Sequence, residues 1–164
     1  MKINPQRFER LERPSVSEAV ILVSGLPRSG TSMMMRMLAA GGMEIVTDNI
    51  RRPNADNPNG YFELEKIKEL DHDRSWLRDE KGRAIKAISA FLPMLPKDIF
   101  YYVIFMQRHM AEILASQRKM LERRGTADEH SVSDERMAAK YHSYLEATYK
   151  WLRQQDHIHV LYVH

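Results

Sequence analysis

Residues 20–40 contain the feature that most constrains the fold of this chain. An uninterrupted aliphatic run over 19–24 predicts a buried strand of a parallel sheet. A glycine-bounded loop follows, and residues 31–40 have the composition of a helix. Gly25 and Gly30 allow the backbone to approach a ligand, and the amides of the loop and of the first helical turn point toward an anion. The order strand, loop, helix therefore predicts a phosphate-binding cradle.

The loop sequence nearly matches the nucleotide-binding pattern G-x-x-x-x-G-K-[ST]. Thr31 occupies the position of the lysine, and Arg28 supplies the cation instead. A P-loop ATPase or kinase also needs a carboxylate after a buried strand to help hold Mg²⁺. Only Asp48 stands at such a place, and the strand expected before it, 44–47, is short. The sequence therefore argues against an ordinary Mg-ATP enzyme and predicts no metal site.

The rest of the chain alternates expected strands with expected helices. The strands are predicted over 44–47, 83–87, 99–106 and 158–163, and the helices over 63–77, 111–124 and 134–154. This order predicts an α/β protein with a three-layer, P-loop NTPase-like fold, in which a central parallel sheet is flanked by helices. Residues 1–18 are expected to form a polar N-terminal arm and residues 19–164 one domain. Because no helix follows the last strand, we expect this domain to be incomplete at its C-terminal end.

Composition limits the partners and the location of the protein. The formal net charge of +3 suits a small anionic ligand and is too mild for nucleic acid. The absence of cysteine excludes disulfides, thiolate metal sites and cysteine nucleophiles. The N-terminus has no apolar signal region, and the longest apolar run, 99–106, is far shorter than the ~20 residues of a membrane span. We therefore expect a cytoplasmic protein without a membrane span.

A second cation follows the strand predicted over 99–106. Arg108 lies at the carboxyl edge of the sheet, where α/β proteins bind their ligands. Ser116 lies eight residues later, about two turns into the following helix. Together they are suited to bind a phosphate other than the one on the first loop. Two phosphate-binding groups on neighbouring strands indicate a nucleotide that is phosphorylated at two places.

These motifs resemble those of one enzyme family. The stretch Gly25-Leu-Pro-Arg-Ser-Gly-Thr-Ser32 resembles the 5′-phosphosulfate loop of sulfotransferases that use 3′-phosphoadenosine 5′-phosphosulfate (PAPS), in the form seen in protein-tyrosine and many bacterial members. Arg108 and Ser116 resemble the 3′-phosphate pair of that family. Asn57-Pro-Asn-Gly-Tyr-Phe-Glu63 is similar to a stretch of the bacterial members. The resemblance runs from about residue 19 to the end, and the family's C-terminal glycine-rich segment has no counterpart.

The resemblance implies transfer of a sulfuryl group from PAPS to an acceptor hydroxyl or amine, with 3′,5′-ADP as product and no metal. The residues that it assigns to the nucleotide are Arg28, Ser29, Gly30, Thr31, Ser32, Arg108 and Ser116. Arg28 is also predicted to be catalytic, because a fixed guanidinium can neutralise charge on the bridging oxygen as the sulfuryl group leaves.

Sulfuryl transfer to a hydroxyl needs a base near the acceptor. Glu63 is the predicted base, because it follows the irregular loop 51–60 and begins a helix; a glutamate that only stabilises the helix end is the alternative. Lys86 matches a lysine of the protein-tyrosine branch, although a solvated lysine at a strand end is the simpler interpretation. The substitutes for the base are Asp48, Glu65 and His72.

Other interpretations of the chain stay open. A nucleotide-kinase-like phosphotransferase would need Mg²⁺ and ATP, and a catalytically inactive nucleotide-binding module would act through protein contacts. His157 and His159 share a strand face, but no third ligand lies nearby in the sequence. They are interpreted as solvent-facing residues of an edge strand.

Overall fold

The computed structural model describes residues 13–48, 50–51, 53–54, 57, 60–125 and 132–164. Residues 1–12 of the predicted arm lie outside this description, and so do parts of the loops 51–60 and 125–133. Within the arm, the described residues include a short 3-10 turn, η2 (Val16–Glu18).

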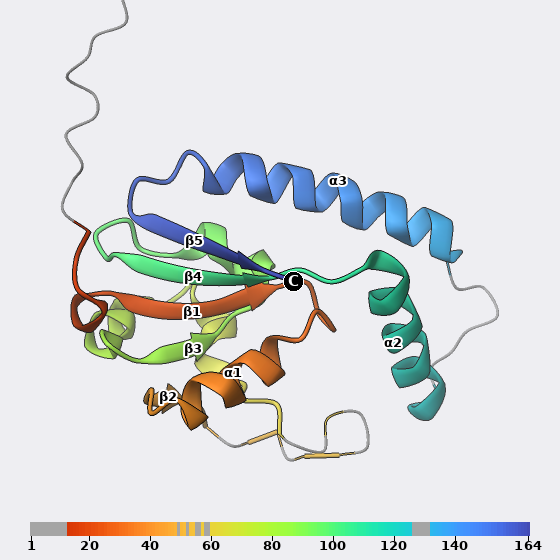
Figure 1. Ribbon diagram of the computed structural model, residues 1–164, viewed down its shortest axis with the longest axis horizontal. Coiled ribbons are helices and arrows are strands. Elements are labelled where there is room, and N and C mark those ends of the chain that lie inside the picture. The colour runs from red at the N-terminus through yellow and green to blue at the C-terminus, as the bar shows by residue number, and fades with distance from the viewer. Residues whose placement is uncertain (1–12, 49, 52, 55–56, 58–59, 126–131) are drawn as a thin grey trace, which may run out of the picture.

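A five-stranded parallel sheet forms the centre of the fold (Figure 1). Its strands are β1 (Val20–Gly25), β2 (Ile45–Val46), β3 (Ala84–Lys86), β4 (Tyr101–Met106) and β5 (Ile158–Val163). They lie in the order β2-β3-β1-β4-β5, and each neighbouring pair is parallel. The predicted α/β class, with a central parallel sheet flanked by helices, is confirmed. The arrangement is consistent with a three-layer P-loop-like fold.

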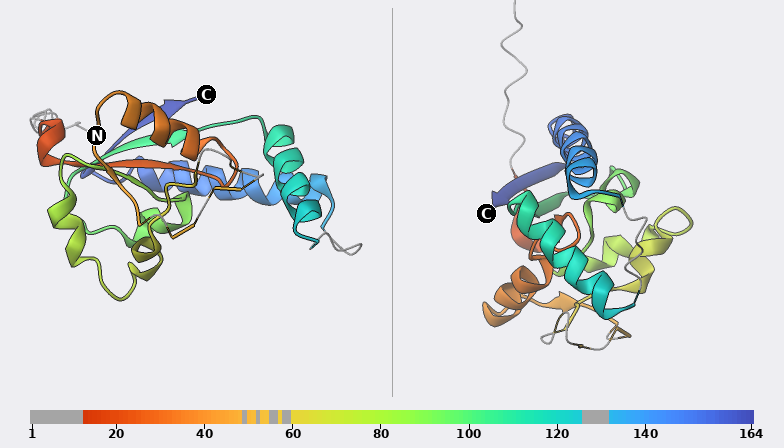
Figure 2. Two further views of the ribbon diagram at one scale, coloured as in Figure 1. Left: turned by 90° about the horizontal axis from the view of Figure 1, so that it is seen from below. Right: turned by 90° about the vertical axis from the view of Figure 1, so that its right-hand side faces the viewer.

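Helices lie on both faces of this sheet and beyond the carboxyl ends of its strands (Figure 2). Helix α1 (Thr31–Ala40) covers one face, and α3 (Asp134–Leu152) covers the other together with the 3-10 turns. Helix α2 (Met110–Arg123) stands beyond the carboxyl ends of the strands and contacts α3. The 3-10 turns that cover a face of the sheet together with α3 are η3 (Glu65–Glu69), η4 (Ser75–Glu80) and η5 (Ser89–Met94). Among the described residues, none of the helices has both the length and the apolar character that a bilayer crossing requires.

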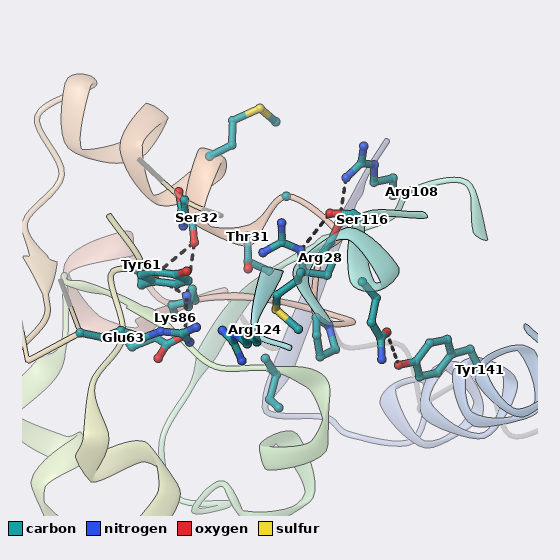
Figure 3. Close-up of a pocket in the computed structure, with 18 residues that line it drawn as sticks. Arg28, Thr31, Ser32, Tyr61, Glu63, Lys86, Arg108, Ser116, Arg124 and Tyr141 are labelled. Carbon is teal, nitrogen blue, oxygen red and sulfur yellow. Dashed lines mark hydrogen bonds and ion pairs between the residues drawn. The ribbon is translucent and has the colours of Figure 1, made fainter. Parts of the chain in front are cut away.

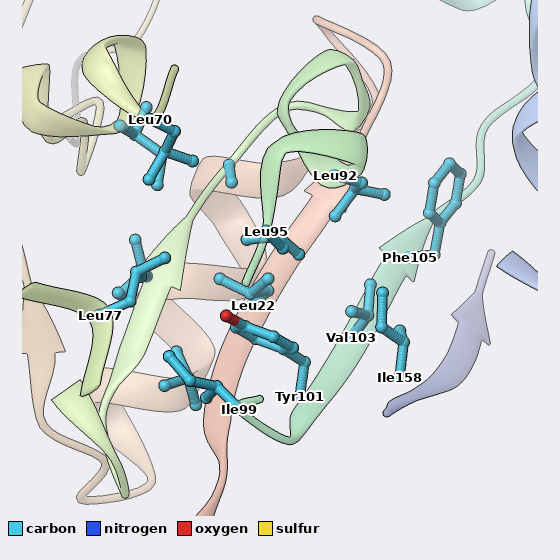
Figure 4. Close-up of a cluster of buried hydrophobic side chains, with 14 of the residues drawn as sticks. Leu22, Leu70, Leu77, Leu92, Leu95, Ile99, Tyr101, Val103, Phe105 and Ile158 are labelled. Carbon is cyan, nitrogen blue, oxygen red and sulfur yellow. The ribbon is translucent and has the colours of Figure 1, made fainter. Parts of the chain in front are cut away.

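The alternating side chains of β1 contribute to two apolar cores. Val20 and Leu22 belong to a large cluster with the 3-10 turns and α3 (Figure 4). Ile21 and Val23 belong to the second cluster, which includes Met35 of α1. Because both faces of the sheet are covered, every residue of β1 is buried. This explains why the sequence of the strand is aliphatic throughout rather than alternating.

The prediction of one helix over 63–77 is wrong, because two separate 3-10 turns, η3 and η4, occupy this region. The apolar spacing of three residues, Leu64 to Ile67 to Leu70, fits a 3-10 turn as well as one face of an α-helix. The Asp73 carboxylate then accepts hydrogen bonds from the amide and hydroxyl of Ser75, at 2.9 and 2.7 Å. Such a side chain favours the start of a new turn over the continuation of a helix.

The strand order places a crevice next to β1. From β1 the chain passes to β2 at one edge of the sheet, and from β4 it passes to β5 at the opposite edge. Because all five strands are parallel, the loops after β1, β3 and β4 emerge at the same edge (Figure 1). Ligands of open α/β sheets bind where the connections diverge in this way.

Candidate functional site

The loop between β1 and α1 (residues 25–30) has a backbone that requires glycine. Gly25 has a φ of 141°, and a Cβ atom there would lie 2.7 Å from the Met106 carbonyl oxygen. Gly30, which immediately precedes α1, has a φ of 101°. These left-handed conformations are accessible to glycine at little cost. The loop can therefore turn tightly against β4 before the helix begins.

The first turn of α1 supplies donors for an anion. The first i to i−4 bond joins the Met34 amide to the Gly30 carbonyl, at 3.1 Å. The amides of residues 30–33 thus precede the helical hydrogen-bond ladder and have no partner within it. Residues 30–33 line a cavity of about 480 Å³ at the carboxyl edge of the sheet. The helix dipole adds partial positive charge at the same place.

The cavity collects side chains from every loop at this edge (Figure 3). The polar residues that line it are Arg28, Thr31, Ser32, Arg51, Asn57, Tyr61, Glu63, Lys86, Arg108, Ser116, Gln117, Arg124 and Tyr141. Five of these side chains are cations and one is a carboxylate, so the cavity is suited to an anionic ligand.

Arg28, Arg108 and Ser116 meet in this cavity. Arg28 Nε donates to Ser116 Oγ at 2.9 Å, and Arg108 Nη1 donates to the Arg28 carbonyl at 3.1 Å. Arg108 Nε also donates to Glu112 Oε2 at 2.8 Å. Because β1 and β4 are neighbours, the two arginines that follow them come together. The structure therefore brings the two predicted phosphate-binding groups to one site.

Ser29 differs from the other residues that were predicted to bind the nucleotide. Its amide donates to the Leu26 carbonyl at 3.2 Å, and its side chain does not line the cavity. Its hydroxyl oxygen is buried next to Gly25 and meets no hydrogen-bond partner within the part of the chain that the structure describes. The contribution of Ser29 is therefore to the shape of the β1–α1 loop rather than to the wall of the cavity.

Glu63, the predicted base, lies on the opposite wall from Arg108. Its Oε1 atom is 2.8 Å from Arg51 Nη1 and 3.4 Å from Lys86 Nζ. The Arg51 guanidinium also lies 3.6 Å from the centroid of the Tyr61 ring. Glu63 is thus held by cations from two different segments while it lines the cavity.

Lys86 is buried, which corrects its interpretation as a solvated lysine. The residue is only 7% exposed, and Nζ donates to the Tyr61 carbonyl and, at 3.3 Å, to Ser32 Oγ. Burial lowers the pKa of the Lys86 amine, while the negative charge of Glu63 acts in the opposite direction. The signal for this placement was its position at the carboxyl end of β3, beside Val23 of β1.

The predicted substitutes for the base do not line the cavity in the described structure. The Asp48 carboxylate accepts hydrogen bonds from the amides of Glu65 and Ile50, at 2.6 and 2.9 Å, and these bonds hold its pKa below the usual range. The Glu65 carboxylate pairs with Lys68 at 2.7 Å. His72 is highly exposed next to Asp71.

The two histidines near β5 are less solvated than predicted. Burial lowers the pKa of both His157 and His159. The His159 ring stacks on Phe100, with 5.6 Å between ring centroids. Among the residues that the structure describes, no three His, Asp or Glu side chains form a group that could hold a metal ion.

Comparison with protein-family models gives no match, and comparison with curated proteins gives none either. The geometry of the cavity and the motifs that form it are therefore the features that indicate a function.

Proposed function

We propose that the chain is a PAPS-dependent sulfotransferase, which moves a sulfuryl group from PAPS to the hydroxyl or amine of an acceptor. The observation that carries this proposal is the meeting of Arg28, Arg108 and Ser116 in one cavity with the amino end of α1. PAPS carries one anionic group at its 5′ position and another at its 3′ position. A site that offers anion-binding amides and a separate arginine–serine pair matches both.

Each phosphate of the donor has its own set of residues under this proposal. The amides of residues 30–32 and the hydroxyls of Thr31 and Ser32 bind the 5′-phosphate. Arg108 and Ser116 bind the 3′-phosphate, for which a guanidinium is suited by its fork of donors. Arg28 lies between the two sets, since it contacts Ser116 and belongs to the β1–α1 loop.

The proposed transfer is a single in-line displacement at sulfur. The acceptor oxygen or nitrogen forms a bond to sulfur as the bond between sulfur and the bridging phosphate oxygen breaks. The electron pair of the broken bond stays on that oxygen, and 3′,5′-ADP leaves. Arg28 neutralises the charge that develops on the bridging oxygen. The Glu63 carboxylate accepts the proton that the acceptor loses.

A nucleotide-binding module without turnover is the second candidate, and one observation favours it. Glu63 Oε1 contacts both Arg51 and Lys86, at 2.8 and 3.4 Å, so the oxygen expected to accept a proton is already engaged by two cations. Such an arrangement suits a carboxylate that shapes the wall of the site. The two candidates share the nucleotide and differ in whether a sulfated product forms.

Thermal unfolding in the presence of 3′,5′-ADP, 5′-AMP, ATP and Mg-ATP tests the proposal. A ligand at one hundred times its Kd stabilises the fold by about 2.7 kcal/mol, which is measurable as a shift in Tm. We expect the largest shift with 3′,5′-ADP in the presence of EDTA. A shift with Mg-ATP alone would instead indicate a kinase-like phosphotransferase. Incubation with PAPS and a panel of hydroxyl and amine acceptors, followed by mass spectrometry, then separates the enzyme from the inactive module.

A further inference from the structure

The segment that carries Glu63 (residues 60–63) has a strained backbone. Gly60 and Phe62 both have positive φ angles, of 91° and 51°. For a bulky residue such as Phe62 this conformation is rare and energetically unfavourable. A residue in this state persists only where the surrounding structure holds it. The contacts that hold the segment therefore also determine where the Glu63 side chain points.

The carbonyl group of Tyr61 is the main point at which the segment is held. It accepts one hydrogen bond from Ser32 Oγ, at 3.2 Å, and another from Lys86 Nζ. Ser32 belongs to the first turn of α1 and Lys86 ends β3, so the two donors come from separate elements. Tyr61 itself is 5% exposed, and its hydroxyl donates to Asn54 Oδ1 at 2.7 Å. The strained Phe62 thus follows a residue that is fixed at both its carbonyl and its ring.

Lys86 contacts both ends of the strained segment. Its ammonium group donates to the Tyr61 carbonyl and also lies 3.4 Å from Glu63 Oε1 (Figure 3). The backbone of Glu63 has a separate support, because its carbonyl accepts from Thr47 Oγ1 at 2.9 Å. Arg51 also links Tyr61 to this carboxylate, because its guanidinium lies over the Tyr61 ring and 2.8 Å from Glu63 Oε1. Of the two cations, Lys86 is the one that also donates to the backbone carbonyl before Phe62.

We propose that Lys86 is a positioning residue, which directs the Glu63 carboxylate into the cavity by holding the Tyr61 carbonyl and the left-handed Phe62. Ser32 links this arrangement to the β1–α1 loop, so that the nucleotide and the base are coupled through one carbonyl group. The roles of Ser32 and Glu63 in this statement rest on the proposed function. The contacts of Lys86 do not depend on that function.

The effect of a bound phosphate on the segment 60–63 follows from the single proton of the Ser32 hydroxyl. A serine hydroxyl has one proton to donate, and in this structure it goes to the Tyr61 carbonyl. When Ser32 donates to the 5′-phosphate instead, the Tyr61 carbonyl retains the bond from Lys86 alone. Lys86 then has to hold the segment without help. Its removal should therefore disturb Glu63 most when a phosphate occupies the loop.

A double-mutant cycle on kcat tests the positioning role. Lys86→Met keeps a long apolar stem in this buried site and removes the ammonium group. We expect it to lower kcat by about tenfold or more and to change the KM for PAPS by less than about twofold. In the Glu63→Gln background the same substitution should cause no further loss. Equal losses of kcat in both backgrounds, or a rise in KM as large as the fall in kcat, would show that Lys86 acts on the donor directly.

Amide NMR provides a second test that does not need turnover. In Lys86→Met without ligand, we expect shifts at Phe62 and Glu63, and in the native chain we expect smaller shifts at the same amides when inorganic pyrophosphate binds the loop. Lys68→Met, which removes an exposed ammonium paired with Glu65, is the matched control and should leave these amides in place. Unchanged Phe62 and Glu63 amides in Lys86→Met overturn the positioning role. Shifted amides in a chain that transfers no sulfuryl group overturn the proposed function and leave the positioning role intact.

If Lys86→Met does not fold, Ser32→Ala tests the same carbonyl from its other donor. This variant removes the hydroxyl that Tyr61 accepts and leaves the ammonium of Lys86. We expect its Phe62 amide to shift and its Tm to stay close to that of the native chain. A Phe62 amide that keeps its native position in Ser32→Ala contradicts the proposed coupling.

Discussion

Arg28 and Ser116 are 88 residues apart in the chain, and a 2.9 Å hydrogen bond joins the guanidinium of one to the hydroxyl of the other. The contact connects the loop that follows β1 to the helix that follows β4. It exists because β1 and β4 are neighbours and parallel, so that both chain segments leave the sheet at the same edge. Arg108 strengthens the junction by donating to the Arg28 carbonyl. Two groups that the sequence predicts to bind phosphate, and that are distant in the chain, thereby meet at one site.

Replacing Arg108 should weaken the nucleotide mainly through its 3′-phosphate. A hydrogen bond to a charged group contributes about 1.5–3 kcal/mol, so Arg108→Ala is expected to raise the Kd of 3′,5′-ADP by roughly 10- to 100-fold. The Kd of 5′-AMP should change by less than about threefold. Isothermal titration calorimetry measures both. Arg118→Ala, which removes an arginine of α2 paired with Asp134 outside the cavity, is the control. An equal loss for both nucleotides would show that Arg108 does not bind the 3′-phosphate.

Two substitutions of Arg28 should separate the effect of its side chain on catalysis from the effect of its backbone conformation on stability. Arg28 has a φ of 70°, which is unfavourable for any residue with a Cβ atom. Both Arg28→Ala and Arg28→Gly should lower the rate of transfer, by about 10²- to 10³-fold. Arg28→Gly should nevertheless be more stable than Arg28→Ala, by about 1 kcal/mol, in chemical denaturation. Transfer at the native rate in either variant contradicts the catalytic role, and equal stabilities contradict the left-handed loop.

The part of the site that could be predicted from the sequence is the part that is encoded locally. The aliphatic strand, Gly25 and Gly30 occur within a few residues of each other, and each has a direct consequence for the backbone. Arg108 and Ser116 could be placed because a strand end and a helical spacing fix them relative to each other.

The opposite wall of the cavity could not be predicted in the same way. The position of Lys86 at the end of a three-residue strand indicates that it lies near the site, but the neighbouring residues do not indicate that its side chain is buried. Its partner is the carbonyl of Tyr61, which is 25 residues away, and a backbone oxygen leaves no trace in the sequence. The left-handed Phe62 is equally unexpected, since aromatic residues rarely adopt this conformation. Its existence depends on contacts from α1 and β3 that form only in the complete fold.

Removing the charge of Glu63 should abolish proton transfer without affecting nucleotide binding. Glu63→Gln has nearly the same shape, and we expect kcat to fall by about 10²- to 10⁴-fold. The Kd of 3′,5′-ADP should stay within about threefold of the native value, because the proposed role of Glu63 is in proton transfer and its carboxylate lies across the cavity from Arg108 and Ser116 (Figure 3). Glu65→Gln, two residues later and paired with Lys68, is the control and should retain activity. Full turnover of a natural acceptor by Glu63→Gln would rule out the base assignment.

Asp48 should stabilise the fold in a pH-dependent manner. The amides of Glu65 and Ile50 hold the pKa of its carboxyl below the ordinary value, so the folded state favours the charged form. The stabilisation is therefore fully present above pH ~4, near the ordinary pKa of aspartate, and is lost as the pH falls through the folded-state pKa. Asp48→Asn should lower the free energy of unfolding at pH 7 by about 1 kcal/mol. The difference from the native chain should shrink below pH ~4.

A urea titration series from pH 7 down to the acid limit of the fold checks this expectation for Asp48. Asp71→Asn, which changes an exposed aspartate next to His72, should follow the native curve. A constant difference between Asp48→Asn and the native chain at all pH values would mean that the hydrogen bonds to Asp48 do not depend on its charge.

A crystal structure of the complex with 3′,5′-ADP, grown in the presence of EDTA, tests the two-phosphate site most directly. The account predicts the 5′-phosphate on the amides of residues 30–32 and the 3′-phosphate within hydrogen-bond distance of both Arg108 and Ser116. A nucleotide whose 3′-phosphate points to solvent, or that binds away from the β1–α1 loop, would contradict it.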